Sequence, residues 1–143
     1  MATAKWATPS AQGSNIASTT LDSLANGSTS TLITHDNSSN LDLYANVSIA
    51  LGSFTSTTGA SITLRVFSTA GSGPDVPDAT GSVGGGDQYV VPITVGASAK
   101  QIVIPMIRLY PTSMRLCVTN NGGAALAASS NTLKVQPFNE SVA

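Results

Sequence analysis

The chain has 143 residues, of which 41% are hydrophobic and only 9% are charged, and its formal net charge at pH 7 is −1. This length fits one domain with one sizeable core, and the patterned apolar runs argue against a disordered chain. With only 6 Lys and Arg residues and no basic cluster, the sequence excludes the positive surface on which nucleic-acid binding depends. A net charge near zero favours association with other protein surfaces.

The N-terminal stretch MATAKWATPS lacks the apolar region of a secretory signal, and no later run reaches the roughly 18 apolar residues of a membrane span. We therefore expect a protein made in a cytoplasm, with no membrane partner. Residues 1–15 are predicted to form an extended arm, and residues 16–143 a single domain. The lone tryptophan, Trp6, lies in this arm, where it could anchor the arm to a neighbouring subunit or pack on its own domain.

Apolar and polar residues alternate with period two along much of the chain, which predicts half-buried strands. Residues 16–21 and 29–34 are weaker predictions that rest on β-branched residues, with a turn at 21–24. In the clearest segment Leu41, Leu43, Ala45, Val47, Ile49 and Leu51 share one face. The strong alternating segments are residues 41–51, 61–67, 113–119 and 132–136.

Two further segments, residues 88–95 and 100–107, are apolar at nearly every position. This pattern predicts strands that are covered on both faces. Each segment also contains a proline, Pro92 or Pro105, which cannot donate a hydrogen bond to a ladder. We therefore expect each proline at a sheet edge or at a bulge.

About eight short strands separated by Gly, Pro, Asn and Ser predict an all-β protein, a single antiparallel β-sandwich with an extended N-terminal arm. A jelly roll and an immunoglobulin-like arrangement both remain open. Residues 114–119 and 132–136 are interpreted as the last β-hairpin, turning at Asn120-Asn-Gly-Gly123. One connection, residues 69–87, is long enough to predict a functional or mobile loop.

Few residues could carry catalysis. His35 and Asp36 are adjacent in sequence, so their side chains diverge instead of forming the base and orienting acid of a triad. Cys117 lies in a predicted strand without a nearby His to lower its pKa, which indicates a packed thiol and not a nucleophile. We predict that the chain is not an enzyme.

No cofactor or metal site is predicted. Asp75, Asp78 and Asp87 supply oxygen ligands in the long loop but lack the spacing of a calcium-binding loop. Gly84-Gly-Gly86 lacks the Lys and Ser/Thr of a phosphate-binding loop, so it is interpreted as a flexible linker.

Three stretches, Asn40-Leu-Asp-Leu-Tyr-Ala45, Arg115-Leu-Cys-Val-Thr-Asn-Asn-Gly122 and Asn131-Thr-Leu-Lys-Val-Gln-Pro-Phe-Asn-Glu140, resemble small virion structural proteins of tailed bacteriophages. The likeness covers roughly residues 26–140. It implies a capsid decoration, or cement, protein that is made in the cytoplasm of a bacterial host and binds the major capsid protein on the virion surface. It carries over no catalytic residue. The low charge and the polar arm themselves predict a homo-oligomer, a trimer or a dimer, in which residues 1–15 reach across to a neighbouring subunit.

Two residues are predicted to meet a partner. Trp6 is an aromatic side chain in a polar arm, and Phe138 follows Pro137 at the end of the last predicted strand, where it covers the edge or contacts another subunit. The principal alternative function is a tail or fibre component whose β-sandwich binds carbohydrate. Aromatic platforms for sugars would have to come from Trp6, three Tyr and three Phe residues.

Overall fold

The computed structural model describes residues 4–17, 19–68 and 86–142. These residues form an all-β structure without helix, in which every strand pairing is antiparallel. The described strands are β1 (Ala4–Trp6), β2 (Ile33–His35), β3 (Tyr44–Ser56), β4 (Ser61–Ser68), β5 (Asp87–Pro92), β6 (Gly96–Arg108), β7 (Met114–Asn121), β8 (Thr132–Phe138) and β9 (Glu140–Val142).

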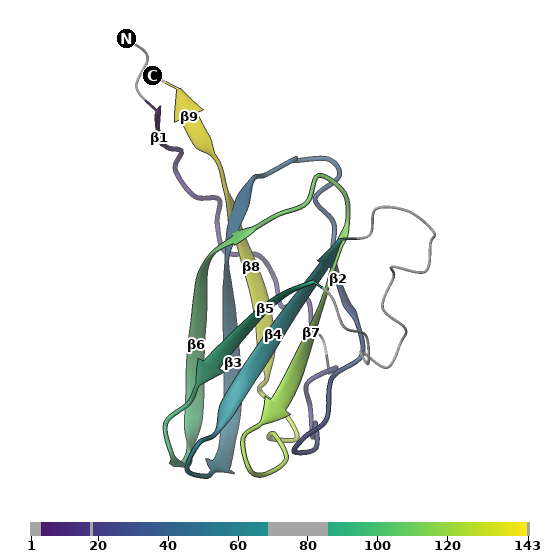
Figure 1. The fold of residues 1–143 in the computed structure, drawn as a ribbon, viewed down its shortest axis with the longest axis vertical. Helices are drawn as coiled ribbons and strands as arrows, with labels where there is room; N and C mark the ends of the chain where they lie inside the picture. The colour runs from purple at the N-terminus through teal and green to yellow at the C-terminus, as the bar shows by residue number, and fades with distance from the viewer. Residues whose placement is uncertain (1–3, 18, 69–85, 143) are drawn as a thin grey trace.

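The strands form three sheets. One has four strands in the order β2-β7-β4-β5, one has three in the order β6-β3-β8, and β1 pairs with β9 in a two-stranded ribbon. The two larger sheets lie as two layers, and the β1–β9 ribbon extends beyond the body at the end where both termini lie (Figure 1). The result is a sandwich-like domain with a protruding ribbon.

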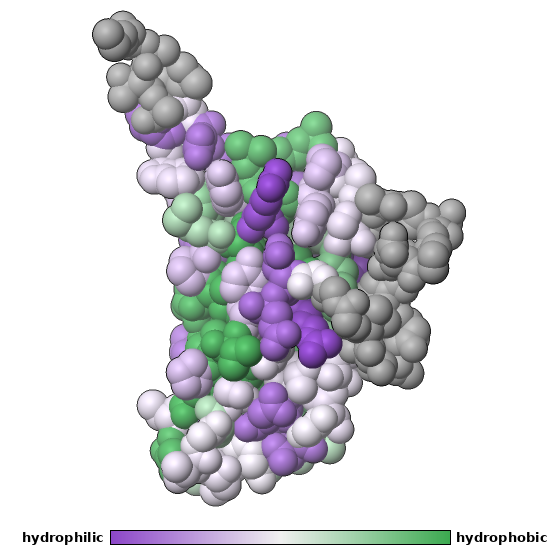
Figure 2. Space-filling model, viewed as in Figure 1, coloured by the Kyte–Doolittle hydropathy of each residue, from purple (hydrophilic) through white to green (hydrophobic). Residues whose placement is uncertain are grey.

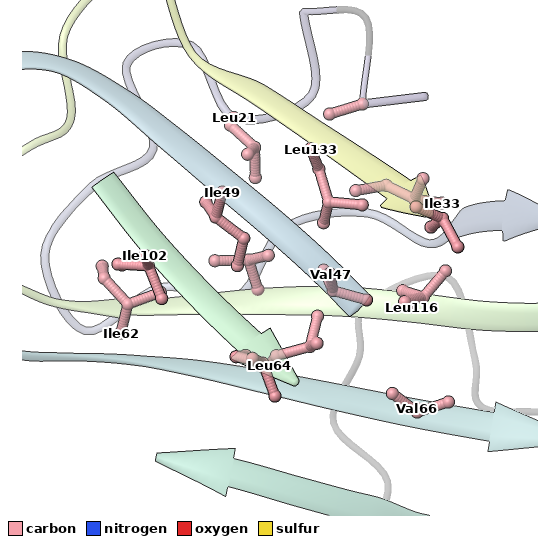
Figure 3. Close-up of a cluster of buried hydrophobic side chains, with 14 of the residues drawn as sticks. Leu21, Ile33, Val47, Ile49, Ile62, Leu64, Val66, Ile102, Leu116 and Leu133 are labelled. Carbon is pink, nitrogen blue, oxygen red and sulfur yellow. The ribbon is translucent and has the colours of Figure 1, made fainter. Parts of the chain in front are cut away.

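The core lies between the two larger sheets. Alternate residues of β3 turn inward, and Val47 and Ile49 are fully buried. Ile62, Leu64 and Val66 of β4 meet them from the other sheet, as the side chains between the layers show (Figure 3). Full burial of one such side chain contributes roughly 1.5–3 kcal/mol.

The six strong strand predictions are confirmed, with bounds that differ by a few residues. The strand predicted at residues 16–21 is wrong for the residues described there, because residues 16 and 17 form a bend and residues 19–21 belong to turns, with hydrogen bonds from the N–H of Thr20 to the carbonyl of Ala17 and from the N–H of Leu24 to that of Leu21. Of residues 29–34 only Ile33 and Thr34 belong to a strand, and Thr29 forms an isolated bridge to Thr119.

The expectation that residues 88–95 and 100–107 are covered on both faces is wrong. They contribute to β5 and β6, which are edge strands of their sheets, and Val90 and Val103 are 56% and 57% exposed. The expectation for the prolines is confirmed, since both lie in these edge strands. Pro105 also falls where the β3–β6 register shifts, beside Met106 with its φ of 54°.

The expected hairpin between β7 and β8 is also wrong, because these strands belong to different sheets. Residues 122–131 carry the chain from one layer to the other at the end opposite the termini (Figure 1). The Nδ2 of Asn120 donates to the carbonyls of Leu24 and Ala124, and the Nδ2 of Asn131 donates to the carbonyl of Ala127. These bonds satisfy loop carbonyls that no strand pairs, so the crossing needs no tight turn.

Residues 7–16 run beside β8 of the same chain. Four of their N–H groups donate to β8 or to the residue after it: Ala7 to Asn139, Ser10 to Pro137, Gly13 to Val135 and Ile16 to Leu133. The donors are three residues apart and the acceptors two, so the contact is not a regular ladder. The predicted arm therefore contributes to the packing of its own domain. The predicted loop sites at Asp75, Asp78 and Gly84–Gly85 lie outside the described residues.

Candidate interaction surface

Three aromatic side chains from distant parts of the sequence meet at the end of the domain near the termini. The rings of Tyr44 and Phe138 are stacked with centroids 5.8 Å apart. The ring of Trp6 stands edge-on to both, with centroids 5.8 Å from Tyr44 and 5.6 Å from Phe138. Edge-to-face and offset-stacked contacts of this kind stabilise aromatic pairs beyond their burial.

The strand pairings dictate this meeting. Tyr44, the first residue of β3, lies opposite Phe138, the last residue of β8, so the two rings share one face of the sheet. Trp6 pairs with Glu140 of β9, and the next N–H, that of Ala7, donates to the carbonyl of Asn139 over 2.8 Å. The backbone on both sides of Phe138 is therefore held, and Trp6 is placed over it.

Two asparagines brace the loop that precedes Tyr44. Asn139 accepts from the N–H of Leu43 at 2.8 Å and donates from Nδ2 to the carboxylate of Asp42 at 2.8 Å. Asn37, which is buried, accepts from the N–H of Asp42 and donates to the carbonyls of Asp42 and Tyr110. The loop is fixed by these bonds and not by burial of its leucines.

A cleft of about 310 Å³ opens beside the aromatic cluster, lined by Trp6, Ala7, Pro9, Asn46, Met106 and Phe138. The bulge at Pro105 directs Met106 outward, where its side chain is 52% exposed. The N–H of Met106 donates to the Oδ1 of Asn46 over 3.2 Å, which ties the bulge to β3. The cleft is therefore mainly apolar, with Asn46 as its polar member.

A second cleft of about 380 Å³ lies on the other side of Tyr44, lined by Leu41, Asp42, Leu43, Tyr44, Arg108, Leu109 and Pro111. Leu41 and Leu43 are 55% and 50% exposed, and Leu41 has a φ of 52°. Arg108 pairs with Tyr44 in the β3–β6 register and is exposed at the rim. Tyr44 joins the two clefts because its ring also contacts Trp6.

We call this surface the terminal patch and define it by Trp6, Leu41, Leu43, Tyr44 and Met106. Among the described residues seven large hydrophobic side chains are exposed, and four of them belong to the terminal patch. In Figure 2 hydrophobic residues appear at the end of the body nearest the termini and along the β6 side, while the face over β4 and β7 is pale to purple. Exposed apolar side chains that gather in this way mark interaction sites more often than scattered ones do.

The structure brings together both residues that the sequence predicted to meet a partner. Trp6 is 54% exposed, whereas Phe138 is 8% exposed and supports Trp6 from below. The inward positions predicted for Leu41 and Leu43 are wrong, because β3 begins only at Tyr44. Met106 was not predicted as part of this surface. The sequence feature that could have indicated it is its position directly after Pro105, a proline expected at an edge or a bulge.

The pKa values of His35, Asp36 and Cys117, the titratable residues singled out in the sequence, are shifted by their local surroundings. Burial lowers the pKa of His35, against the opposing influence of the Asp36 and Asp42 charges. Hydrogen bonds from the side chain and the N–H of Ser38, and to a lesser extent from the hydroxyl of Ser113, lower the pKa of the Asp36 carboxyl. Burial raises the pKa of Cys117, as expected of a packed thiol.

Neither a cluster of metal-binding side chains nor a helix able to span a membrane occurs among the described residues. No three His, Cys, Asp or Glu side chains among them gather closely enough to hold a metal ion. No helix in the described ranges has the length and apolar character that a bilayer span requires. Comparison with known proteins finds no matching family model, curated protein or solved structure.

Proposed function

We propose that the chain is a structural subunit of a virus particle and not an enzyme. In this proposal it is a capsid decoration protein that binds the major capsid protein on the virion surface through the terminal patch. The observation that carries the proposal is the patch itself, a cluster of half-exposed apolar side chains held in place by hydrogen-bonded asparagines. Buried aromatic anchors surrounded by a polar rim are typical of the residues that dominate protein–protein affinity.

The stretches that resemble virion proteins support this proposal by where they lie. Tyr44 belongs to the stretch at 40–45 and Phe138 to the stretch at 131–140, and their rings stack. Asn139 of the second stretch bonds to both Asp42 and Leu43 of the first. Two of the three stretches therefore meet at the terminal patch, whereas the third lies mainly in β7, and Trp6 and Met106 of the patch belong to none of them.

We also infer that the sandwich is a jelly roll. In an eight-stranded jelly roll numbered along the chain, strands 2, 7, 4 and 5 form one sheet and strands 1, 8, 3 and 6 form the other. The larger sheet has the order β2-β7-β4-β5, and the smaller has β8-β3-β6. Residues 7–16 run beside β8 and take the place of the first strand. Jelly rolls occur in viral capsid and lectin domains, so the fold agrees with the proposal by analogy.

The proposal is tested by binding to capsid shells stripped of the chain. The wild-type chain should sediment with the shells, and Trp6→Ala should weaken the binding by at least about tenfold, because central aromatic anchors contribute about 2 kcal/mol or more. Leu43→Ala should weaken it less, since a leucine at the edge of the patch buries less area. Thr31→Ala, at an exposed position outside the patch, is the matched control.

Circular dichroism and thermal unfolding of each variant show whether the domain remains folded. Because Trp6 is more than half exposed, its removal should leave the secondary structure intact. Equal binding of the wild-type chain and Trp6→Ala would exclude the terminal patch as the docking surface. Failure of the folded wild-type chain to bind shells would overturn the decoration role.

A second function, carbohydrate binding by a tail or fibre component, is favoured by one observation. The exposed ring of Trp6 borders the cleft that also contains Asn46, which supplies an aromatic face next to an amide. A glycan array probed with the wild-type chain tests this function. A hit that disappears with Trp6→Ala, together with no binding to shells, would replace the decoration role by this one.

A further inference from the structure

The flank of the sandwich where β5 and β6 lie at the sheet edges is a second apolar surface. Val90, Val95 and Val103 are 56%, 61% and 57% exposed, and we call them the valine flank. A groove of about 240 Å³ runs along it, lined by Val91–Thr94 and Ala99–Val103. Figure 2 shows hydrophobic residues along this side of the body, where Figure 1 places β6.

The outer edge of β6 is open. β6 pairs with β3 on one side, and no backbone hydrogen bond joins its other side to any segment of the described chain. In an antiparallel edge strand every second residue turns its N–H and C=O outward, and these groups fit another extended strand. The chemistry of the edge therefore selects a β-strand as its occupant.

The flank also lacks the charges that normally prevent edge strands from pairing. Between residues 88 and 107 the only charged residue is Lys100. Lys100 is 5% exposed, and its ammonium group donates to the carbonyl of Gly96 at 3.0 Å and to the hydroxyl of Ser98 at 2.8 Å. Because the ammonium is bound back onto its own strand, it does not project from the edge as a protecting lysine would.

The prolines limit where a strand can add. Pro105 lies at the bulge in β6, so regular pairing beyond it is interrupted. Pro92 ends β5 in the same way. The part of the flank that can accept a strand is therefore β6 from residue 96 to residue 104.

We propose that this edge pairs with the same edge of a second copy of the chain, antiparallel and across a two-fold axis. Two identical edges meeting in this way make the self-complementary contact of a symmetric dimer. Pairing within residues 98–104 places the axis at Gln101, so Val103 of each copy would lie beside Ala99 of the other on the exposed face of the joined sheet, and no charge on that face opposes the contact. This inference does not depend on the proposed function, because it rests on the open edge of β6 and not on the terminal patch.

Sedimentation equilibrium of the purified chain tests the proposal. The wild-type chain should form a dimer, and Val103→Glu should raise its dissociation constant at least about tenfold, because it buries a carboxylate that has no partner against Ala99 of the other copy. Thr34→Glu is the control, since Thr34 is an exposed residue of β2, an edge strand of the other sheet. It should leave the dimer unchanged.

Disulfide trapping locates the interface. Gln101→Cys, at the axis, should give a cross-linked dimer under mild oxidation, and Ala99→Cys and Val103→Cys, two residues from the axis, should cross-link far less. Lys134→Cys is the control, because Lys134 lies opposite Ser48 in the same row as Val103 but two strands from the edge. The native Cys117 is buried and should not cross-link while the domain is folded.

A wild-type chain that stays monomeric at every accessible concentration would overturn the proposal. A dimer that Val103→Glu leaves intact, or that cross-links through Lys134→Cys and not through β6, would place the interface elsewhere. If the wild-type chain is monomeric alone but Val103→Glu abolishes its binding to shells, the edge accepts a strand of the capsid partner and self-pairing is wrong. Loss of shell binding by Trp6→Ala with an intact dimer leaves the proposal standing, so the two surfaces are tested separately.

Discussion

Asparagine side chains brace the loops at both ends of the sandwich, but the surfaces that they support differ. At the end opposite the termini, Asn120 and Asn131 are 0% and 3% exposed. Near the termini, Asn37 and Asn139 brace the loop before β3. In both places an amide replaces backbone partners that an irregular loop lacks.

The end opposite the termini is closed around small residues. The Nδ2 of Asn131 donates to the Asp22 carboxylate at 2.7 Å, and its Oδ1 accepts from the N–H of Gly52 at 3.1 Å. A Cβ at Gly52 would lie 2.5 Å from the carbonyl oxygen of Ser129, so the loop packs directly on the backbone of β3. The large side chain of this loop, Leu126, is buried in the core.

At the terminal end, the asparagines bind the backbone of a loop whose large side chains point outward. Asn139 fixes the backbone of Leu43 while the leucine itself stays half exposed. A loop held by hydrogen bonds can present an apolar surface without collapsing onto the core. Similar bracing by asparagines therefore serves stability at one end and, in our proposal, recognition at the other.

The largest expected effect is a loss of stability at the closed end that leaves shell binding unchanged. Asn120→Ala should lower the free energy of unfolding by about 2 kcal/mol, because it leaves the carbonyl of Ala124 and the N–H of Gly122 without this partner and removes one of the two donors to the carbonyl of Leu24. Urea unfolding measures the change. The folded fraction should bind shells as the wild-type chain does. Weaker binding by that fraction would mean that the loops around Asn120 also contribute to recognition.

A smaller loss of stability is expected from the equivalent change at the terminal end. Asn139→Ala should lower the free energy of unfolding by about 1 kcal/mol, since its partners can reach water. Shell binding should nevertheless weaken, because the loop that carries Leu43 is no longer fixed. If shell binding is unchanged while stability falls, Asn139 serves the fold alone.

The smallest effect concerns pH at His35, close to the braced loop. Burial holds the folded-state pKa of His35 below its ordinary value of 6.5, so the unfolded chain binds the proton more readily. The contribution of neutral His35 to the free energy of unfolding is fully present above about pH 6.5 and is lost as the pH falls toward the folded-state pKa. The lowered pKa of Asp36 acts in the same direction, but only near or below its ordinary value of 3.8.

The comparison of the wild-type chain with His35→Gln checks this prediction. Unfolding free energies measured between about pH 5 and pH 7 should rise with pH in the wild-type chain and rise less in the variant. A steeper slope in the variant would mean that protonated His35 stabilises the fold through Asp36 and Asp42, contrary to the effect of burial.

Local patterns predicted the strands of this protein well, because alternation at period two reports which side chains face a core. They could not predict lateral order, as β7 and β8 show, since neighbouring strands in sequence can enter different sheets. Alternation also misplaced Leu41 and Leu43, because the pattern continues past the residue where β3 begins. The apolar runs that contain Val90 and Val103 predicted strands covered on both faces. Such a run does not reveal whether the second face is covered by the protein or exposed to solvent.

The terminal patch was predicted only in part for the same reason. Trp6 stood out as an aromatic residue in a polar arm, and Phe138 as the residue after a proline that ends a strand. Their contact depends on the pairing of β1 with β9, which joins the two ends of the chain and leaves no local signature. Met106 and Leu43 become neighbours of this pair only through β3 and its partners.

Cryo-electron microscopy of the virus particle tests the central claim most directly. The chain should appear on the outer surface of the capsid, with the end that carries Trp6 and Leu43 against the major capsid protein and the loops around Asn120 directed away from it. A chain found in the tail, or bound to the capsid with the terminal patch facing solvent, would contradict the proposed function.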